Sequence, residues 1–137
     1  MASRKLFVTL EDFDLLLELL KEELLGAISD PKAARDLATE LQHATIVDSA
    51  SVPDDVVTMN STVKLTDLET KRTETYTLVY PDDVNITVGR LSILAPIGTA
   101  ILGNQVGHTV GGSDSADKSI LRIDEVIYQP ERDSVAA

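Results

Sequence analysis

The chain has 137 residues, an apolar fraction of 43% and a formal net charge of −11, with 23 acidic residues against 12 basic ones. This length suits one ordinary domain, or one small domain with an appendage. The basic residues are scattered, which argues against direct nucleic-acid binding, because such binding depends on clustered lysine and arginine. The absence of cysteine excludes disulfides and thiolate metal sites. With no apolar run near the roughly 18 residues that cross a bilayer, a reducing, cytoplasmic location is expected.

Two helices are predicted in the first third of the chain. Thr9-Leu10-Glu11-Asp12 has the form of a helix N-cap, and Gly26 supplies a C-terminal stop. Asp30-Pro31 indicates the cap and first position of a second helix, which runs to about Ala44. The first helix carries an apolar stripe at steps of three and four: Leu10, Phe13, Leu17, Leu20 and Leu24. Further leucines widen this stripe, so we expect it to pack against the second helix and also against the rest of the chain or a second copy.

The remainder of the chain has β-type patterns. Residues 48–55 are polar and without periodicity, which is typical of a linker. Strands are predicted at 56–59, 62–68, 73–80, 91–94, 106–110 and 119–128, with a helix of about two turns starting at Pro96. Residues 131–137 are expected to form a frayed tail. The predicted class is α+β: a short antiparallel helical hairpin at 1–47, a linker at 48–55, and an antiparallel β-domain with one short helix at 56–137.

No residue pattern indicates catalysis. His43 and His108 have no nucleophile motif beside them and no spacing that suggests a shared metal. The pairs Asp54-Asp55 and Asp82-Asp83 could in principle hold Mg²⁺, but each lies beside a proline in a predicted loop, where aspartate serves turn geometry. The glycines between residues 98 and 112 match no phosphate-binding motif. The sequence therefore predicts a protein without a catalytic, metal or cofactor site, which is not an enzyme.

One segment resembles a known family. Residues 91–110, LSILAPIGTAILGNQVGHTV, are similar to a signature of the C-terminal domain of Gre-type transcription elongation factors, with the proline, glycines and apolar positions in register. A closer resemblance is to the short-fingered subfamily of the regulator of nucleoside diphosphate kinase. It rests on the segments at 55–61, 77–81, 94–96 and 128–131. The resemblance implies an antiparallel coiled coil followed by an FKBP-like β-domain.

The resemblance also implies a partner. Gre factors bind RNA polymerase, with the β-domain at the rim of the secondary channel and a proline-containing turn in contact. In this chain the matching residues are Ser92, Leu94, Ala95, Pro96 and Ile97. Leu94 stands where Gre proteins often carry an acidic residue, so a contact there would be apolar. His108 replaces a usual aspartate, a change expected to affect a turn.

In cleavage-stimulating Gre factors the finger tip offers carboxylates to a second Mg²⁺, which activates water for transcript hydrolysis. Here the tip residues Ile28, Ser29 and Asp30 hold one carboxylate, which a helix cap would occupy. The prediction is therefore a polymerase-binding regulator without cleavage activity. Two alternatives stay open: a cleavage-stimulating elongation factor, and a prolyl isomerase-like enzyme, which would need an aromatic-lined pocket. A homo-oligomer through the first helix is compatible with each.

Overall fold

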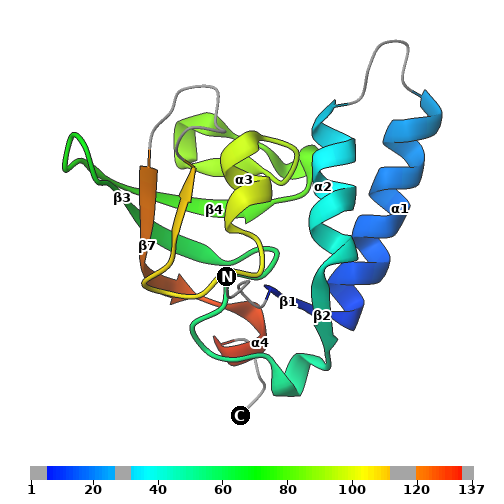
Figure 1. The fold of residues 1–137 in the computed structure, drawn as a ribbon, viewed down its shortest axis with the longest axis horizontal. Coiled ribbons are helices and arrows are strands. Elements are labelled where there is room, and N and C mark those ends of the chain that lie inside the picture. Colours follow the sequence, from blue (N-terminus) through cyan, green and yellow to red (C-terminus); the bar gives the residue numbers. More distant parts are fainter. Residues whose placement is uncertain (1–5, 27–31, 112–119, 134–137) are drawn as a thin grey trace.

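Two helices stand side by side on one flank of the computed structural model, which describes residues 6–26, 32–111 and 120–133 (Figure 1). α1 spans Leu10–Gly26 and α2 spans Lys32–Gln42. Thr9 caps α1 as predicted, because its Oγ1 accepts a 3.1 Å hydrogen bond from the Asp12 amide, one of the donors that a first helical turn leaves unpaired. The expected cap at Asp30-Pro31 lies outside the described residues.

The buried face of α1 differs from the predicted stripe. Leu16 and Leu20 are 0% and 5% exposed, whereas Leu10 and Leu17 are 47% and 44% exposed. Leu10 and Leu17 are therefore not covered by α2 or the β-domain as Leu16 and Leu20 are, and their packing against a second copy stays a prediction. Leucines occupy positions all round this helix, so spacing alone could not decide which of them α2 and the β-domain would cover. On α2 the buried residues are Ala34, Leu37 and Leu41.

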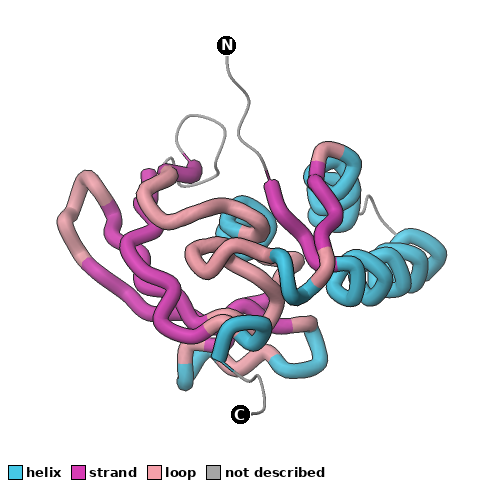
Figure 2. Tube along the Cα trace, turned by 90° about the horizontal axis from the view of Figure 1, so that it is seen from below, coloured by secondary structure: helices cyan, strands magenta, loops and turns pink. Residues whose placement is uncertain are grey.

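A two-stranded parallel sheet closes the base of the hairpin (Figure 2). β1 spans Leu6–Thr9 and β2 spans Ala44–Val47, and the hairpin is the crossover that a parallel pair requires. The Phe7 amide donates a 3.1 Å hydrogen bond to the Gly103 carbonyl oxygen. Gly103 has φ +79°, and a Cβ there would lie 3.2 Å from the Phe7 backbone nitrogen and oxygen, so glycine permits the close approach. The sequence did not predict these strands, because four residues are too few to show an alternation.

The β-domain is a curled five-stranded sheet, and with the hairpin it confirms the predicted α+β class. Its strands are β3 (Thr62–Asp67), β4 (Thr73–Val79), β5 (Arg90–Ser92), β6 (Thr109–Gly111) and β7 (Ile120–Tyr128). Their order is β5-β4-β3-β7-β6, and every neighbouring pair is antiparallel except β4 and β5. The β4–β5 crossover contains the short 3-10 helices η2 (Pro81–Asp83) and η3 (Ile86–Val88). α3 (Pro96–Ile101) packs between the sheet and α2 (Figure 1).

Two predicted strands need correction. Residues 56–59 form a buried loop in which Val56 makes only an isolated bridge to Gln105. The Val57 amide donates to the Asn104 carbonyl oxygen at 2.9 Å and the Thr58 amide to Ser61 Oγ at 2.9 Å, so the backbone is satisfied without a ladder. The strand expected at 106–110 is reduced to β6, because residues 103–108 turn sharply.

The predicted frayed tail is wrong for its first residues, which belong to α4 (Pro130–Asp133). Gln129 is fully buried, and its Nε2 donates 2.9 Å hydrogen bonds to the carbonyl oxygens of Pro53 and Val56. Arg132 donates to the Asp54 carbonyl oxygen at 3.1 Å. A position at the end of the chain suggested fraying, but these long-range hydrogen bonds hold residues 130–133 in place. The linker at 48–55, which contains the 3-10 helix η1 (Ser49–Ser51), stays a prediction.

Candidate partner-binding site

The turn that joins β5 to α3 is held rigidly by its own hydrogen bonds. Ser92 accepts two of them, from the Leu94 amide to Oγ and from the Ala95 amide to the carbonyl oxygen, both at 3.0 Å. Thr99 Oγ1 donates a 2.6 Å hydrogen bond to the Ile93 carbonyl oxygen. Pro96 starts α3, where its missing amide costs no hydrogen bond. The turn therefore presents its side chains from a fixed backbone.

Gly98 allows α3 to pack directly on this turn. A Cβ at Gly98 would lie 2.2 Å from the Ser92 carbonyl oxygen and 3.1 Å from Leu78 Cδ1. No larger residue fits at that distance without moving the backbone. Gly98 therefore sets the position of the turn relative to α3, and this position determines how far Pro96 is exposed.

The structure divides the five residues predicted to bind a partner. Pro96 is exposed, and the other four are partly exposed. Leu94 and Pro96 line a groove that faces α2, whereas Ile97 points to the opposite side of α3, over the sheet. Ser92 Oγ is engaged within the turn. One short segment thus contributes to two separate surfaces, and whether either binds a partner stays a prediction.

The groove between α2 and α3 has a volume of about 700 Å³, within the range of roughly 300–1,000 Å³ that is usual for ligand sites. One wall is a face of α2, and the other is the turn with α3. Its lining residues are Lys32, Ala33, Asp36, Thr39, Glu40, Leu94, Pro96, Thr99, Ala100 and Gly111. The helical hairpin and the β-domain therefore build this surface jointly.

The α2 wall carries the charges of the groove. Lys32 Nζ and Asp36 Oδ2 form an exposed ion pair at 2.7 Å. Glu40 is half-buried, and this burial raises the pKa of its carboxyl above the usual value. The nearby charge of His43 lowers this pKa and the charge of Asp36 raises it. Sequence reasoning missed this acid. Its signal was the spacing of Ala33, Asp36 and Glu40, which places small and acidic residues on one face of α2.

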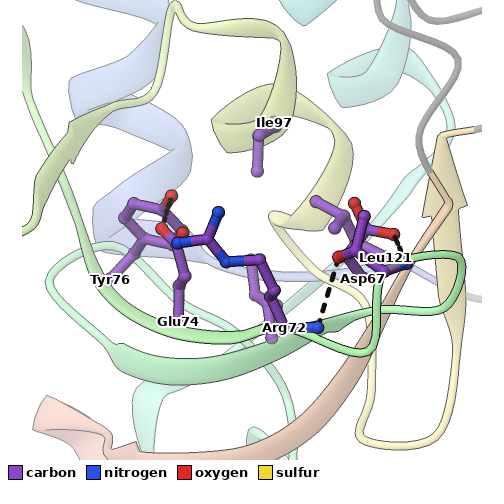
Figure 3. Close-up of a pocket in the computed structure, with 8 residues that line it drawn as sticks. Asp67, Arg72, Glu74, Tyr76, Ile97 and Leu121 are labelled. Carbon is purple, nitrogen blue, oxygen red and sulfur yellow. Dashed lines mark hydrogen bonds between the residues drawn. The ribbon is translucent and has the colours of Figure 1, made fainter.

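A smaller pocket of about 230 Å³ lies on the other side of α3 (Figure 3). Figure 3 shows Ile97 reaching down from α3 toward Arg72, Glu74 and Tyr76 of the β4 side, with Asp67 and Leu121 at the other end. The Tyr76 hydroxyl donates to Glu74 Oε2 at 2.5 Å, and this bond raises the pKa of Tyr76 to about 12. Tyr76 is the one aromatic residue among those that line the pocket. A prolyl isomerase site would require an aromatic lining, so the pocket gives that alternative little support.

A buried acid joins α1 to the β-domain. Asp12 is 9% exposed, and its Oδ2 accepts a 3.1 Å hydrogen bond from the Met59 amide. Burial raises the pKa of Asp12 to about 7, an effect that the Met59 bond opposes and the charge of Glu131 reinforces. The sequence offered a signal, because Asp12 stands four and eight residues before the buried Leu16 and Leu20. The N-cap pattern alone does not reveal this contact.

The predicted tip residues Ile28, Ser29 and Asp30 lie outside the described residues. Across the described ranges, no three histidine or acidic side chains gather as a metal site would require. His108 Nδ1 accepts a long, 3.4 Å hydrogen bond from the Gln105 amide, which is a turn contact. No helix in the described part of the chain is long and apolar enough to cross a membrane.

Comparison with known proteins gives consistent matches. Residues 52–127 match the family described as "Transcription elongation factor, GreA/GreB, C-term". The regulator of nucleoside diphosphate kinase of Escherichia coli K12 is 38% identical over 96 residues, which are 69% of this chain and 71% of that protein. Transcription elongation factor GreA of Chlorobium phaeobacteroides is 38% identical over 77 residues, 55% of this chain and 48% of GreA. The chain thus spans about half the length of that GreA.

A solved structure, a prokaryotic transcription elongation factor GreA/GreB from Nitrosomonas europaea, matches with a TM-score of 0.73 and 35% identity. The match covers 92% of this chain and 100% of the solved chain, so the similarity includes both the hairpin and the β-domain. The motif around Pro96, the fold and the relatives agree. The chain belongs to the GreA/GreB family of transcription elongation factors.

Proposed function

We propose that this protein is a transcription regulator that binds RNA polymerase at the secondary channel and docks through the turn from Ser92 to Ile97. Family membership and the similarity to a regulator of nucleoside diphosphate kinase support this role. The observation that carries the proposal is the rigid turn with Pro96 exposed at its end, where α3 begins. An apolar group held on a fixed backbone loses little conformational entropy when it binds.

Binding to purified core RNA polymerase tests this proposal. The full chain should bind saturably at micromolar concentration or tighter, and Pro96→Asp should weaken binding because it places a charge on the apolar contact. Pro81→Asp is a matched control, since Pro81 begins η2 in another loop. Absence of saturable binding by the unchanged protein at micromolar concentration would contradict the proposal, as would equal losses in both variants.

We further propose that the protein does not stimulate transcript cleavage. α1 has 17 residues and α2 has 11, which at about 1.5 Å per residue gives helices of about 25 and 16 Å, a short finger. The tip sequence between residues 26 and 31 holds one acid, Asp30, whereas positioning a second Mg²⁺ takes several oxygen ligands. A backtracked elongation complex incubated with the protein and Mg²⁺ should release 3′ fragments no faster than without it. Accelerated release would instead identify a cleavage-stimulating factor.

A further inference from the structure

Glu40 is a half-buried acid without an ion-pair partner among the described residues. It lies on the α2 wall of the groove. Lys32, the cation on the same wall, is already paired with Asp36 at 2.7 Å. Burial raises the pKa of Glu40, the charge of His43 lowers it and the charge of Asp36 raises it; the net shift is upward, so the ionised form is destabilised in the free protein. A cation supplied from outside would relieve this cost.

The wall opposite Glu40 is largely apolar. Leu94, Pro96 and Ala100 face the groove from the turn and α3. On α2, Ala33 lines the same groove with only a methyl group, which leaves space between the two walls. The groove therefore offers an apolar surface and an unpaired carboxylate within one cavity of about 700 Å³.

We propose that the groove between α2 and α3 receives a segment of the polymerase that carries an apolar side chain next to a lysine or arginine. The apolar group packs on Leu94 and Ala100, and the cation pairs with Glu40. This inference rests on the proposed function and adds the chemistry of the bound segment. It also assigns a binding role to the hairpin, which would otherwise serve only as a finger.

The charge of the molecule favours this occupant over others. A net charge of −11 attracts a basic surface and repels nucleic acid. The cation becomes enclosed between α2 and the partner, where a charge-assisted hydrogen bond is stronger than one exposed to water. An entirely apolar segment would leave Glu40 buried and unpaired, which is costly. Glu40 therefore selects a basic residue at that point of the partner.

Charge variants of Glu40 test the inference in the full-length protein, with binding to core RNA polymerase as the readout. Glu40→Gln keeps the shape and removes the charge, and it should weaken binding by about ten-fold, the usual effect of losing one charge-assisted bond. Glu40→Lys should weaken binding further through repulsion. Glu69→Lys is the matched control. Glu69 is exposed in the turn that joins β3 to β4, on the flank away from α2 (Figure 1), and its substitution should change affinity by less than about two-fold.

The salt dependence of binding separates a direct ion pair from a structural effect. Affinity of the unchanged protein should fall as salt rises from about 50 to 300 mM, and the fall should be shallower for Glu40→Gln, which lacks the pair. A fold defect in Glu40→Gln would lower affinity at every salt concentration equally. Ala33→Trp provides a second approach, because an indole fills the groove and leaves Glu40 in place, and it should also weaken binding.

The outcomes distinguish the inference from the proposed function. If Pro96→Asp weakens binding while Glu40→Gln, Glu40→Lys and Ala33→Trp do not, the inference is wrong and the docking turn stands. If the unchanged protein does not bind polymerase, both are wrong. Weaker binding by the groove variants, an altered salt dependence for Glu40→Gln and no effect of Glu69→Lys support both. Equal weakening by Glu69→Lys would show a general charge effect and overturn the inference.

Discussion

At the scale of single residues, Gly98 and Asp12 show how one side chain positions a larger part of the protein. Gly98 lets α3 lie against the Ser92 carbonyl oxygen, and this contact determines how the Pro96 turn is displayed. Asp12 binds the Met59 amide and so ties the start of α1 to the β-domain. Neither residue is among those that line the groove, yet each helps to fix the elements that form it.

Gly98→Ala should destabilise the fold by at least about 3 kcal/mol, because its new methyl group overlaps a backbone carbonyl oxygen that cannot move alone. Gly107→Ala is the comparison. Gly107 has φ +94° and open space around its Cα, so alanine there costs only the left-handed conformation, about 1–2 kcal/mol. Urea denaturation of the two variants and the unchanged protein measures both changes in the free energy of unfolding. Equal costs would show that α3 can shift to accept the methyl group.

Asp12 should make stability depend on pH. Its pKa is about 7 in the folded protein against 3.8 for the unperturbed side chain. The folded state therefore binds the proton more tightly, and the free energy of unfolding should fall as pH rises from about 4 to about 7. Each pH unit between the unfolded and the folded pKa of Asp12 lowers the free energy of unfolding by about 1.4 kcal/mol, so the total loss is on the order of 4 kcal/mol.

Asp12→Asn isolates this effect, since the amide oxygen can still accept the Met59 bond but does not ionise. Its unfolding free energy, measured in urea at pH 4.5 and pH 8, should fall less between these values than that of the unchanged protein. Glu18→Gln, which removes an exposed acid elsewhere on α1, should keep the original dependence. Parallel curves for the Asp12→Asn and unchanged proteins would show that Asp12 titrates without effect on folding.

At the scale of elements, α1 shows the limit of periodicity. The cap at Thr9 and the stop at Gly26 correctly predicted its start and end, but the leucine pattern did not predict which face is buried. Leu16 and Leu20 enter the same core cluster as Leu37 and Leu41 of α2. Leu15, like Leu10 and Leu17, is exposed, at 55%. These exposed leucines are compatible with the predicted self-association through this helix, which stays a prediction.

Leu16→Ala should cost about 2–5 kcal/mol, because it opens a cavity beneath α2. Leu17→Ala removes the same atoms from a side chain that is 44% exposed, and it should cost less than about 1.5 kcal/mol. Chemical denaturation at a fixed, low protein concentration is the appropriate measurement, so that any self-association does not add to stability. A larger cost for Leu17 would indicate that the other face of α1 is packed.

At the scale of the whole molecule, charge and shape act together. The hairpin and the linker together, residues 1–55, hold 12 of the 23 acidic side chains and 5 of the 12 basic ones, so they carry −7 of the net charge of −11. The hairpin stands beside α3 (Figure 1), and the groove between them combines acidic and apolar walls. This arrangement suits a basic protein surface and opposes direct contact with a phosphate backbone.

We therefore expect no saturable binding to duplex DNA or single-stranded RNA. Fluorescence anisotropy with labelled oligonucleotides should remain flat to about 10 μM protein at about 150 mM salt, where non-specific binders still reach dissociation constants near 10⁻⁴–10⁻⁶ M. A known basic nucleic-acid-binding domain serves as the positive control. A salt-sensitive increase in anisotropy would show a local basic surface that the overall charge conceals.

Much of the fold followed from local patterns. The cap at Thr9, the β3–β4 pair, α3 after Pro96 and the long strand β7 were predicted because each has a signal within a few residues. β1 and β2 were missed because each is only four residues long. α4 was missed because its order depends on hydrogen bonds from Gln129 and Arg132 to residues more than 70 positions earlier.

The sequence by itself determined the α+β class and the family resemblance, because both depend on patterns of neighbouring residues. Through that resemblance it also predicted the five residues of the Pro96 turn as a partner contact, which stays a prediction. The tertiary structure decided which way those residues face. It set Leu94 and Pro96 against α2 and Ile97 over the sheet. It also placed Glu40 in the groove, 54 positions before Leu94 in the chain. Burial and charge at such a site arise from contacts between distant segments, which no local pattern records.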